Sequence, residues 1–170
     1  MLMQSIRDNM LMTVRTLQPL LGFTTRDGIK ESPKLVPTLG NQVDVRVDSY
    51  DKEVQDLSGG NQQKVVLSKW LASKAEIFIF DEPTRGIDVE SKASIHDIIR
   101  GLAKQGVSVL MISSELPEII GMSDRIFVMR DGTIGGELPA ESSEADIMLV
   151  ATGQDNHSTS SNLAEPEREK

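Results

Sequence analysis

Two adjacent carboxylates, Asp81 and Glu82, follow directly on an apolar run at residues 77–80. Such a run is typical of a buried strand, and we expect it to be covered on both faces. Open α/β sheets bind ligands at the carboxyl ends of their strands, which is where the two acids would lie. An aspartate there can hold Mg²⁺, and its glutamate neighbour can accept a proton from an attacking water. The alternative interpretation is a solvated acidic turn that ends the strand.

A second segment that could do chemistry is Ser58-Gly59-Gly60-Asn61, at the start of a predicted helix. Two glycines let a ligand approach the backbone, the first amides of the helix are free, and Ser58 adds a hydroxyl donor. The helix N-terminus also favours negative charge, so the segment suits a phosphate. The alternative is an N-capping serine followed by a flexible glycine pair without a ligand.

The elements that must position these segments alternate between helix and strand. Helical spacing of apolar residues predicts helices, and short apolar runs predict strands. The predicted helices are 5–17, 61–73, 91–104, 116–121 and 144–151, and the predicted strands are 77–80, 107–112, 125–129 and 133–138. Strand, helix and strand over 77–112 form a βαβ unit, so the fold class is α/β with parallel strands flanked by helices. Asp131-Gly132 predicts a hairpin turn, Ser5 with Asp8 a capping box, and Trp70 a core anchor.

Other segments carry weaker patterns. Residues 18–39 are punctuated by proline and glycine, which predicts a functional loop or a poorly ordered stretch. Val43, Val45 and Val47 alternate with polar residues, which indicates a short exposed strand or an extended segment. Residues 153–170 are polar, and we expect a disordered tail there.

Composition excludes several classes of protein. The 170 residues include 18 basic and 26 acidic ones, and the formal charge of −8 argues against a nucleic-acid binder. There is no cysteine, which excludes disulfides, thiolate zinc sites and cysteine nucleophiles. No apolar run approaches a membrane span, and no signal peptide is apparent, so we expect a cytoplasmic protein.

Taken together, the motifs resemble the distal part of an ABC transporter nucleotide-binding domain. LSGGNQQK at 57–64 matches the signature, IFIFDEPT at 77–84 matches Walker B with its glutamate, and RGID at 85–88 matches the D-loop. With SSELPE at 113–118 and GMSDRI at 121–126, they are similar to the second ATPase half of bacterial ribose- and galactose-type importers. ABC ATPases of DNA repair or translation share the signature, but the negative charge and the importer-like strings disfavour them.

The resemblance implies a fold and a set of roles. The fold would be a partial P-loop NTPase domain with part of the helical subdomain. Asp81 would support Mg²⁺, Glu82 would polarise the attacking water, and Asp88 would couple the two sites of a dimer. The signature would contact the γ-phosphate of ATP held on the opposing domain. The nucleotide-binding positions carried over by the resemblance are Ser58, Gly59, Gly60, Asn61, Asp88 and Ser114.

Two departures from the family pattern affect this expectation. Ser114 stands where the family usually has its switch histidine, and a serine cannot make a charged contact to the γ-phosphate. None of the 13 glycines is followed by lysine, so the sequence contains no Gly-Lys-Ser/Thr phosphate loop. We therefore expect the chain alone to bind ATP weakly and not to hydrolyse it.

The predicted organisation has three parts. Residues 1–56 would be a partial helical subdomain and loop, 57–152 the signature and Walker B part, and 153–170 the tail. The implied partners are a second ATPase domain, a membrane permease and a periplasmic sugar-binding protein, with the chain on the inner face of the plasma membrane. The alternative is a non-catalytic module that docks on an intact ATPase or supplies the signature in trans. We also expect an incomplete sheet with an apolar face for a neighbour to cover.

Overall fold

The structure is a computed structural model that describes residues 2–20 and 34–154. Its contacts divide the chain into two compact units, Met1–Ser114 and Glu115–Lys170, and each is described by itself. The part boundaries at residues 56 and 152 come from the motifs and stay predictions. Most of the predicted tail, residues 155–170, lies outside the described residues.

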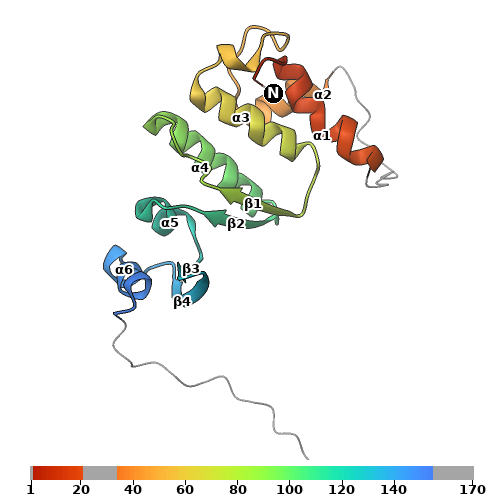
Figure 1. The fold of residues 1–170 in the computed structure, drawn as a ribbon. Helices are drawn as coiled ribbons and strands as arrows, with labels where there is room; N and C mark the ends of the chain where they lie inside the picture. Colours follow the sequence, from red (N-terminus) through yellow and green to blue (C-terminus); the bar gives the residue numbers. More distant parts are fainter. Residues whose placement is uncertain (1, 21–33, 155–170) are drawn as a thin grey trace, which may run out of the picture. The chain divides into compact units, whose positions relative to one another are not determined.

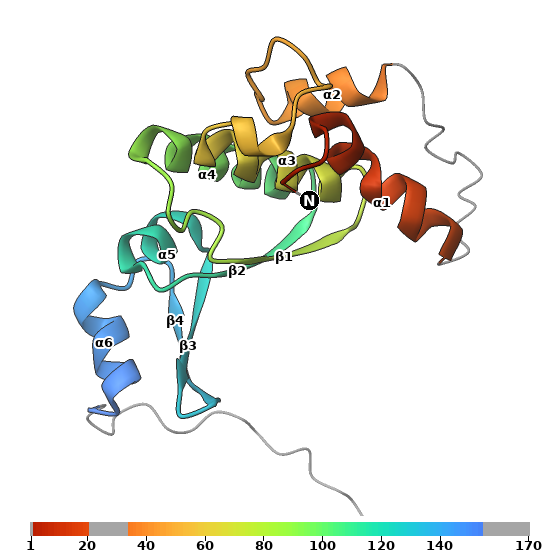
Figure 2. The same ribbon diagram turned by 45° about the horizontal axis from the view of Figure 1, so that its top comes forward.

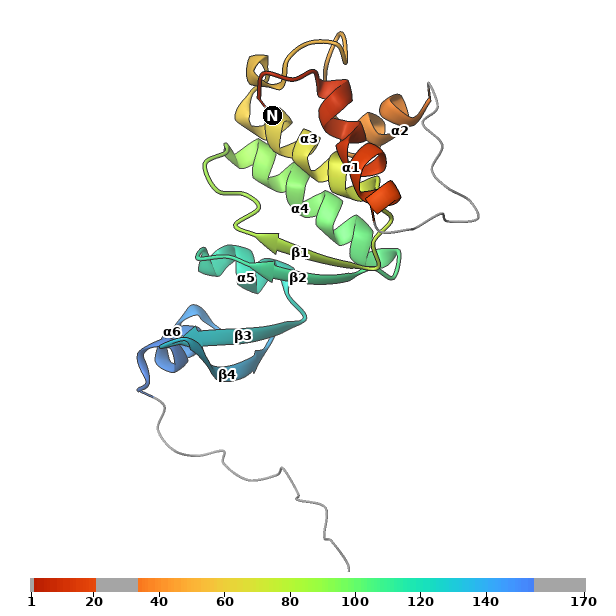
Figure 3. The same ribbon diagram turned by 45° about the vertical axis from the view of Figure 1, so that its right-hand side comes forward.

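The first unit is a layered arrangement of helices on a pair of strands. Its elements in chain order are α1 (Ile6–Leu20), α2 (Leu35–Gln42), the 3-10 turn η1 (Val54–Asp56), α3 (Gly59–Leu71), β1 (Ile77–Asp81), α4 (Val89–Lys104) and β2 (Ser108–Ile112). Helix α4 packs on the strands, α3 lies beside α4, and α1 and α2 pack on α3 (Figures 1 and 3). β1 and β2 pair in parallel, from Ile77 opposite Ser108 to Asp81 opposite Ile112, which confirms the predicted βαβ unit.

Helices α1, α3 and α4 begin beside residues whose side chains accept hydrogen bonds from free backbone amides. Ser5 Oγ accepts a hydrogen bond from the Asp8 amide at 3.0 Å and donates to Asp8 Oδ2 at 2.7 Å, next to the start of α1. Ser58 is the N-cap of α3, and Asp88 is the N-cap of α4. Each cap replaces hydrogen bonds that the first turn of a helix cannot make internally.

Helices α3 and α4 meet at their first turns. Gly60 is buried there, and a Cβ atom on it would clash with the Oγ and Cβ atoms of Ser91, the latter at 2.5 Å. A Cβ on Gly59 would lie 3.7 Å from Ile87 Cγ2, which is an ordinary contact. The approach of the two helices therefore requires glycine at position 60 and not at position 59.

The β1–β2 pair is covered on one face only. Phe78 and Phe80 are each 8% exposed and their rings stack with centroids 5.7 Å apart, whereas Ile77 and Ile79 are 67% and 64% exposed. On β2, Leu110 is also about half exposed. The prediction of a strand covered on both faces is wrong, because the helices of this unit pack on one side of the pair (Figure 3). The expected uncovered apolar face is confirmed.

Residues 18–39 are more ordered than predicted, whereas residues 43–47 do not form the strand that was one of the two predictions for them. Within 18–39, α1 continues to Leu20 and α2 begins at Leu35, while residues 21–33 lie outside the described part. Pro37 falls in the first turn of α2, where a missing amide costs no helical hydrogen bond. Val43 and Val45 are buried, so an exposed strand is wrong, and Asp44 between them has a left-handed φ of 50° that interrupts the extended backbone.

Trp70 is not the predicted core anchor. Its side chain is 45% exposed, and the Lys69 ammonium lies 5.2 Å from the ring centroid. Helix α3 instead buries Val65 and Ser68, and the Thr13 hydroxyl of α1 donates to the Lys69 carbonyl. This packing leaves the indole partly in solvent.

The second unit is a hairpin with two helices. Its elements are α5 (Leu116–Met122), β3 (Arg125–Arg130), β4 (Thr133–Pro139) and α6 (Glu144–Thr152). The antiparallel strands join through Asp131 and Gly132, whose φ angles of 50° and 78° are those of the predicted tight turn. Helix α6 packs along the hairpin and contacts α5 (Figure 2). The core of this unit is formed by Ile126, Val128, Ile147 and Val150.

Substitutions at adjacent positions of β1 should have different effects on stability, because one side chain is buried and the other is exposed. Phe80→Ala opens a cavity under α4 and should lower the free energy of unfolding of the first unit by about 3–5 kcal/mol. Ile79→Ser removes exposed apolar surface and should change it by about 0.5 kcal/mol or less while reducing binding of a hydrophobic dye. Urea unfolding followed by Trp70 fluorescence measures the free energy of unfolding of both variants, since Trp70 is the sole tryptophan. An equal loss for both variants would mean that the Ile79 face is covered.

The α3–α4 contact gives a second prediction. Gly60→Ala should destabilise the first unit by about 1–3 kcal/mol, because the new methyl group overlaps Ser91. Gly59→Ala is the matched control and should be neutral or slightly stabilising. Adding Ser91→Gly to Gly60→Ala should restore part of the loss in the same urea experiment. If Gly60→Ala and Gly59→Ala behave alike, the close contact does not exist in solution.

Candidate functional site

The carboxyl ends of β1 and β2 bring Glu82 and Ser114 together. Asp81 is exposed as the last residue of β1, and the Glu82 amide donates to the Ile112 carbonyl at 2.9 Å. The Ser114 amide then donates to Glu82 Oε1 at 3.0 Å, although the two residues are 32 positions apart. Two predicted site residues that follow different strands are thus joined by a hydrogen bond.

Glu82 adopts a backbone conformation that is unusual for a residue with a side chain. Its φ is 48°, in the left-handed region, and the Arg85 amide donates to the Glu82 carbonyl at 3.2 Å to form a turn. Thr84, inside this turn, is 1% exposed. Such conformations persist only where the surroundings enforce them, and they gather at functional sites.

The signature segment presents an exposed helix N-terminus. Ser58 and Gly59 are exposed, whereas Gly60 is buried against Ser91. Ser58 Oγ accepts from the Asn61 amide at 3.4 Å and from Asn61 Nδ2 at 3.2 Å. An anion could therefore reach the amides near Ser58 and Gly59, where the helix dipole favours negative charge.

Asn61 joins the signature helix to the preceding loop. Its Nδ2 donates to Ser58, and its Oδ1 accepts from the Arg46 amide at 3.4 Å. The Asn61 side chain thus fixes local structure on both sides, and its predicted contact to nucleotide stays a prediction.

Asp88 has both carboxylate oxygens engaged in capping α4. Oδ1 accepts from the Ser91 amide and Oδ2 from the Ser91 hydroxyl, each at 2.8 Å. The Ser91 amide, and then its hydroxyl, hold the pKa of the Asp88 carboxyl below its ordinary value. The coupling role implied for Asp88 by the family resemblance stays a prediction.

Two residues that the sequence reasoning missed connect the parts of the site. Gln63 Nε2 donates to the Pro83 carbonyl at 2.9 Å and so ties α3 to the turn that follows Glu82. Ser91 contacts Gly60 and holds Asp88. Gln63 stands in the signature string, but only the packing of α3 on this turn shows what it binds.

Asp81 fits a partial role in holding Mg²⁺. Within residues 2–20 and 34–154, no group of three or more His, Cys, Asp or Glu side chains could form a metal cage. Magnesium commonly binds through one or two carboxylates together with phosphate oxygens and waters. An exposed aspartate at a strand end is compatible with that arrangement.

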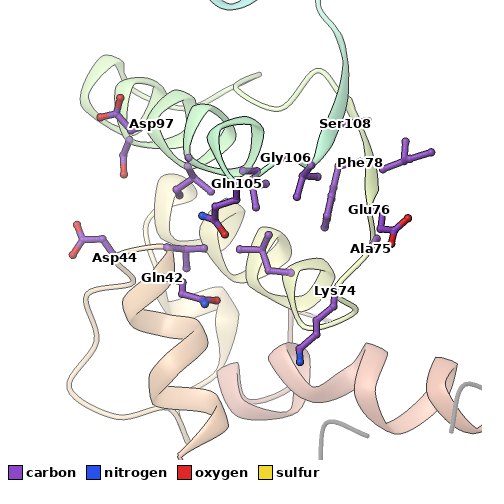
Figure 4. Close-up of a pocket in the computed structure, with 18 residues that line it drawn as sticks. Gln42, Asp44, Lys74, Ala75, Glu76, Phe78, Asp97, Gln105, Gly106 and Ser108 are labelled. Carbon is purple, nitrogen blue, oxygen red and sulfur yellow. The ribbon is translucent and has the colours of Figure 1, made fainter. Parts of the chain in front are cut away.

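A concavity of about 1020 Å³ lies away from these carboxylates, at the amino ends of β1 and β2. It is lined by Lys74, Glu76, Phe78, Asp97 and Gln105, among others (Figure 4). Asp81 and Glu82 occupy the other end of β1, so the candidate site is the exposed carboxyl edge rather than this concavity.

The described residues contain no helix that is both long and apolar enough to cross a membrane.

Comparison with known proteins gives consistent results. The ABC transporter family matches the chain over residues 2–85. The ribose import ATP-binding protein RbsA of Roseobacter denitrificans is 49% identical over 126 residues, covering 72% of this chain and 25% of that protein. RbsA of Corynebacterium glutamicum is 39% identical over 168 residues, covering 98% of this chain and 32% of that protein.

Solved structures share the fold. One is a dimeric ATP-binding cassette in a post-hydrolysis state bound to ADP and Pi, with a TM-score of 0.68 and 17% identity over 84% of this chain and 60% of that one. Another is the ADP conformation of an ATP-binding cassette of an ABC transporter, with a TM-score of 0.65, 21% identity, and coverage of 88% of this chain and 59% of that one.

The chain spans about a quarter to a third of the length of these two curated relatives. The matched family, the relatives and the cassette fold agree with the signature and Walker B strings in the sequence. The chain belongs to the ABC transporter family of ATP-binding proteins.

Proposed function

We propose that this chain supplies the signature and carboxylate portion of an ATPase that powers sugar import. The observation that carries the proposal is the placement of the signature helix beside the D-loop and the Glu82 turn in one packed unit. Gln63 and Ser91 make these connections through a hydrogen bond to Pro83 and a close contact with Gly60.

Each part of the unit has a role in this proposal. The amides at Ser58 and Gly59 contact the terminal phosphate of an ATP held mainly by another domain. Asp81 takes part in holding Mg²⁺, which would neutralise developing phosphate charge. Glu82 accepts a proton from the attacking water, and Asp88 couples this site to its counterpart in a dimer.

A second polypeptide region must provide the phosphate loop. No glycine of this chain is followed by lysine, and a phosphate loop makes most of the contacts to the β- and γ-phosphates. The isoleucines of β1, which are about two-thirds exposed, also leave apolar surface for another layer of protein. These two observations equally favour the second candidate, a non-catalytic module that docks on an intact ATPase.

The names of the relatives guide the choice of substrate. They are ribose import and ribose/galactose/methyl galactoside import ATP-binding proteins. The proposal therefore includes a monosaccharide as transported substrate, a membrane permease and a periplasmic sugar-binding protein as partners, and attachment to the cytoplasmic face of the membrane.

Mixing experiments test the proposal directly. The partner polypeptide is a part of the Corynebacterium glutamicum relative that lies outside the region matching this chain and carries a Gly-Lys-Ser/Thr sequence. We expect no ATP hydrolysis by the chain alone and measurable hydrolysis by the mixture. Glu82→Gln should lower the rate of the mixture by about 10²-fold or more, because the proton acceptor is lost.

Glu76→Gln is the matched control, since Glu76 is an exposed acid at the other end of β1 and its change in charge is the same. It should leave the rate unchanged. An inactive mixture in which the two polypeptides still associate would favour the non-catalytic module. Hydrolysis by the chain alone that Glu82→Gln abolishes would contradict the need for a phosphate loop.

A further inference from the structure

We infer that Ser114 positions the Glu82 carboxylate through its main-chain amide, a role that does not depend on the side chain at the switch position. This inference rests on the proposed function, in which Glu82 accepts the proton of the attacking water. It changes the role of Ser114 from a nucleotide contact to a positioning residue.

The first support is the way in which the two strands end. The parallel ladder closes with Asp81 opposite Ile112, and the next bond runs from the Glu82 amide to the Ile112 carbonyl at 2.9 Å. Two residues beyond Ile112, the Ser114 amide donates to Glu82 Oε1 at 3.0 Å. The Glu82 side chain thus takes the place of a backbone acceptor at the end of β2.

The second support is the fixed geometry of Glu82 itself. Its left-handed φ of 48° turns the backbone sharply after β1. The turn is held by the Arg85 amide and, through Pro83, by Gln63 of α3. A carboxylate on such a constrained backbone, with one oxygen bound to an amide, has little freedom to rotate.

The third support is that only one of the two carboxylate oxygens of Glu82 is bonded to the Ser114 amide. Among the described residues, Glu82 Oε2 has no hydrogen-bond partner, whereas Oε1 is occupied. The Ser114 hydroxyl likewise has no partner in this part of the chain, and the residue is exposed. One carboxylate oxygen therefore anchors the group and the other is available to accept a proton. The anchoring atom is the nitrogen of Ser114.

The bond can be tested on the chain itself by NMR spectroscopy. Glu82→Gln removes the negative charge that faces the Ser114 amide, and this amide should show the largest chemical-shift change outside residues 80–85. Glu76→Gln should leave the same signal in place. An unchanged Ser114 signal in Glu82→Gln would overturn the inference whether or not the chain supports ATP hydrolysis.

The functional role is tested by removing one N–H group. In the Ser114→Ala background, an amide-to-ester replacement at position 114 removes the donor and keeps the methyl side chain. In the mixed ATPase, the ester should lower kcat about tenfold or more relative to its amide counterpart while leaving KM for ATP within about twofold. Ser114→Pro, which also lacks the donor, should reproduce the loss.

The outcomes separate the two proposals. An ester as active as its amide counterpart would overturn the positioning role, and so would an ester that raises KM without lowering kcat. A mixture that is inactive with the unmodified chain would contradict the proposed function, and the NMR signal would then decide the positioning bond alone.

Discussion

The close approach of helices α3 and α4 at Gly60 and Ser91 is the constraint on which the rest of the site depends. Only a hydrogen atom fits at Gly60, so the two helix N-termini lie against each other. This contact brings the signature segment to the start of α4, which Asp88 caps. Because Gln63 of the same helix binds the Pro83 carbonyl, the position of α3 also fixes the turn that carries Glu82.

The β1–β2 pair has apolar side chains on both faces, but only one face is covered. Its inner face is filled by Phe78 and Phe80, while Ile77 and Ile79 face outward. Parallel sheets normally bury both faces. The uncovered face and the lack of a Gly-Lys-Ser/Thr sequence both support the proposal that another layer of polypeptide completes the ATP site.

The sequence was sufficient for the main elements of the fold because their signals are local. The Ser5–Asp8 cap, the Asp131-Gly132 turn and the apolar spacing of α4 each depend on residues a few positions apart. Helix α2 was missed because Pro37 and Gly40 resemble helix breakers. Pro37 lies in a first turn, however, and a Cβ on Gly40 would clash with the Tyr50 ring.

The contacts within the site could be predicted only in part. Parallel strands place Asp81 and Glu82 at one edge with the end of β2, and the sequence predicts that much. It does not contain the angle between α3 and α4, so the packing of Gly60 on Ser91 could not be predicted, and the contact of Gly60 to nucleotide stays a prediction. The bond from Ser114 to Glu82 depends on a left-handed backbone at Glu82. A glutamate at this position does not predict that conformation.

Equilibrium binding of labelled ATP, with Mg²⁺ present, is the most direct test of the claim that this chain carries one part of a composite site. We predict weak binding by the chain alone and by the phosphate-loop polypeptide alone, and much tighter binding by the two together. Replacing Ser58 by Ala should weaken binding only in the mixture. Tight binding of ATP by the chain alone would contradict a composite site.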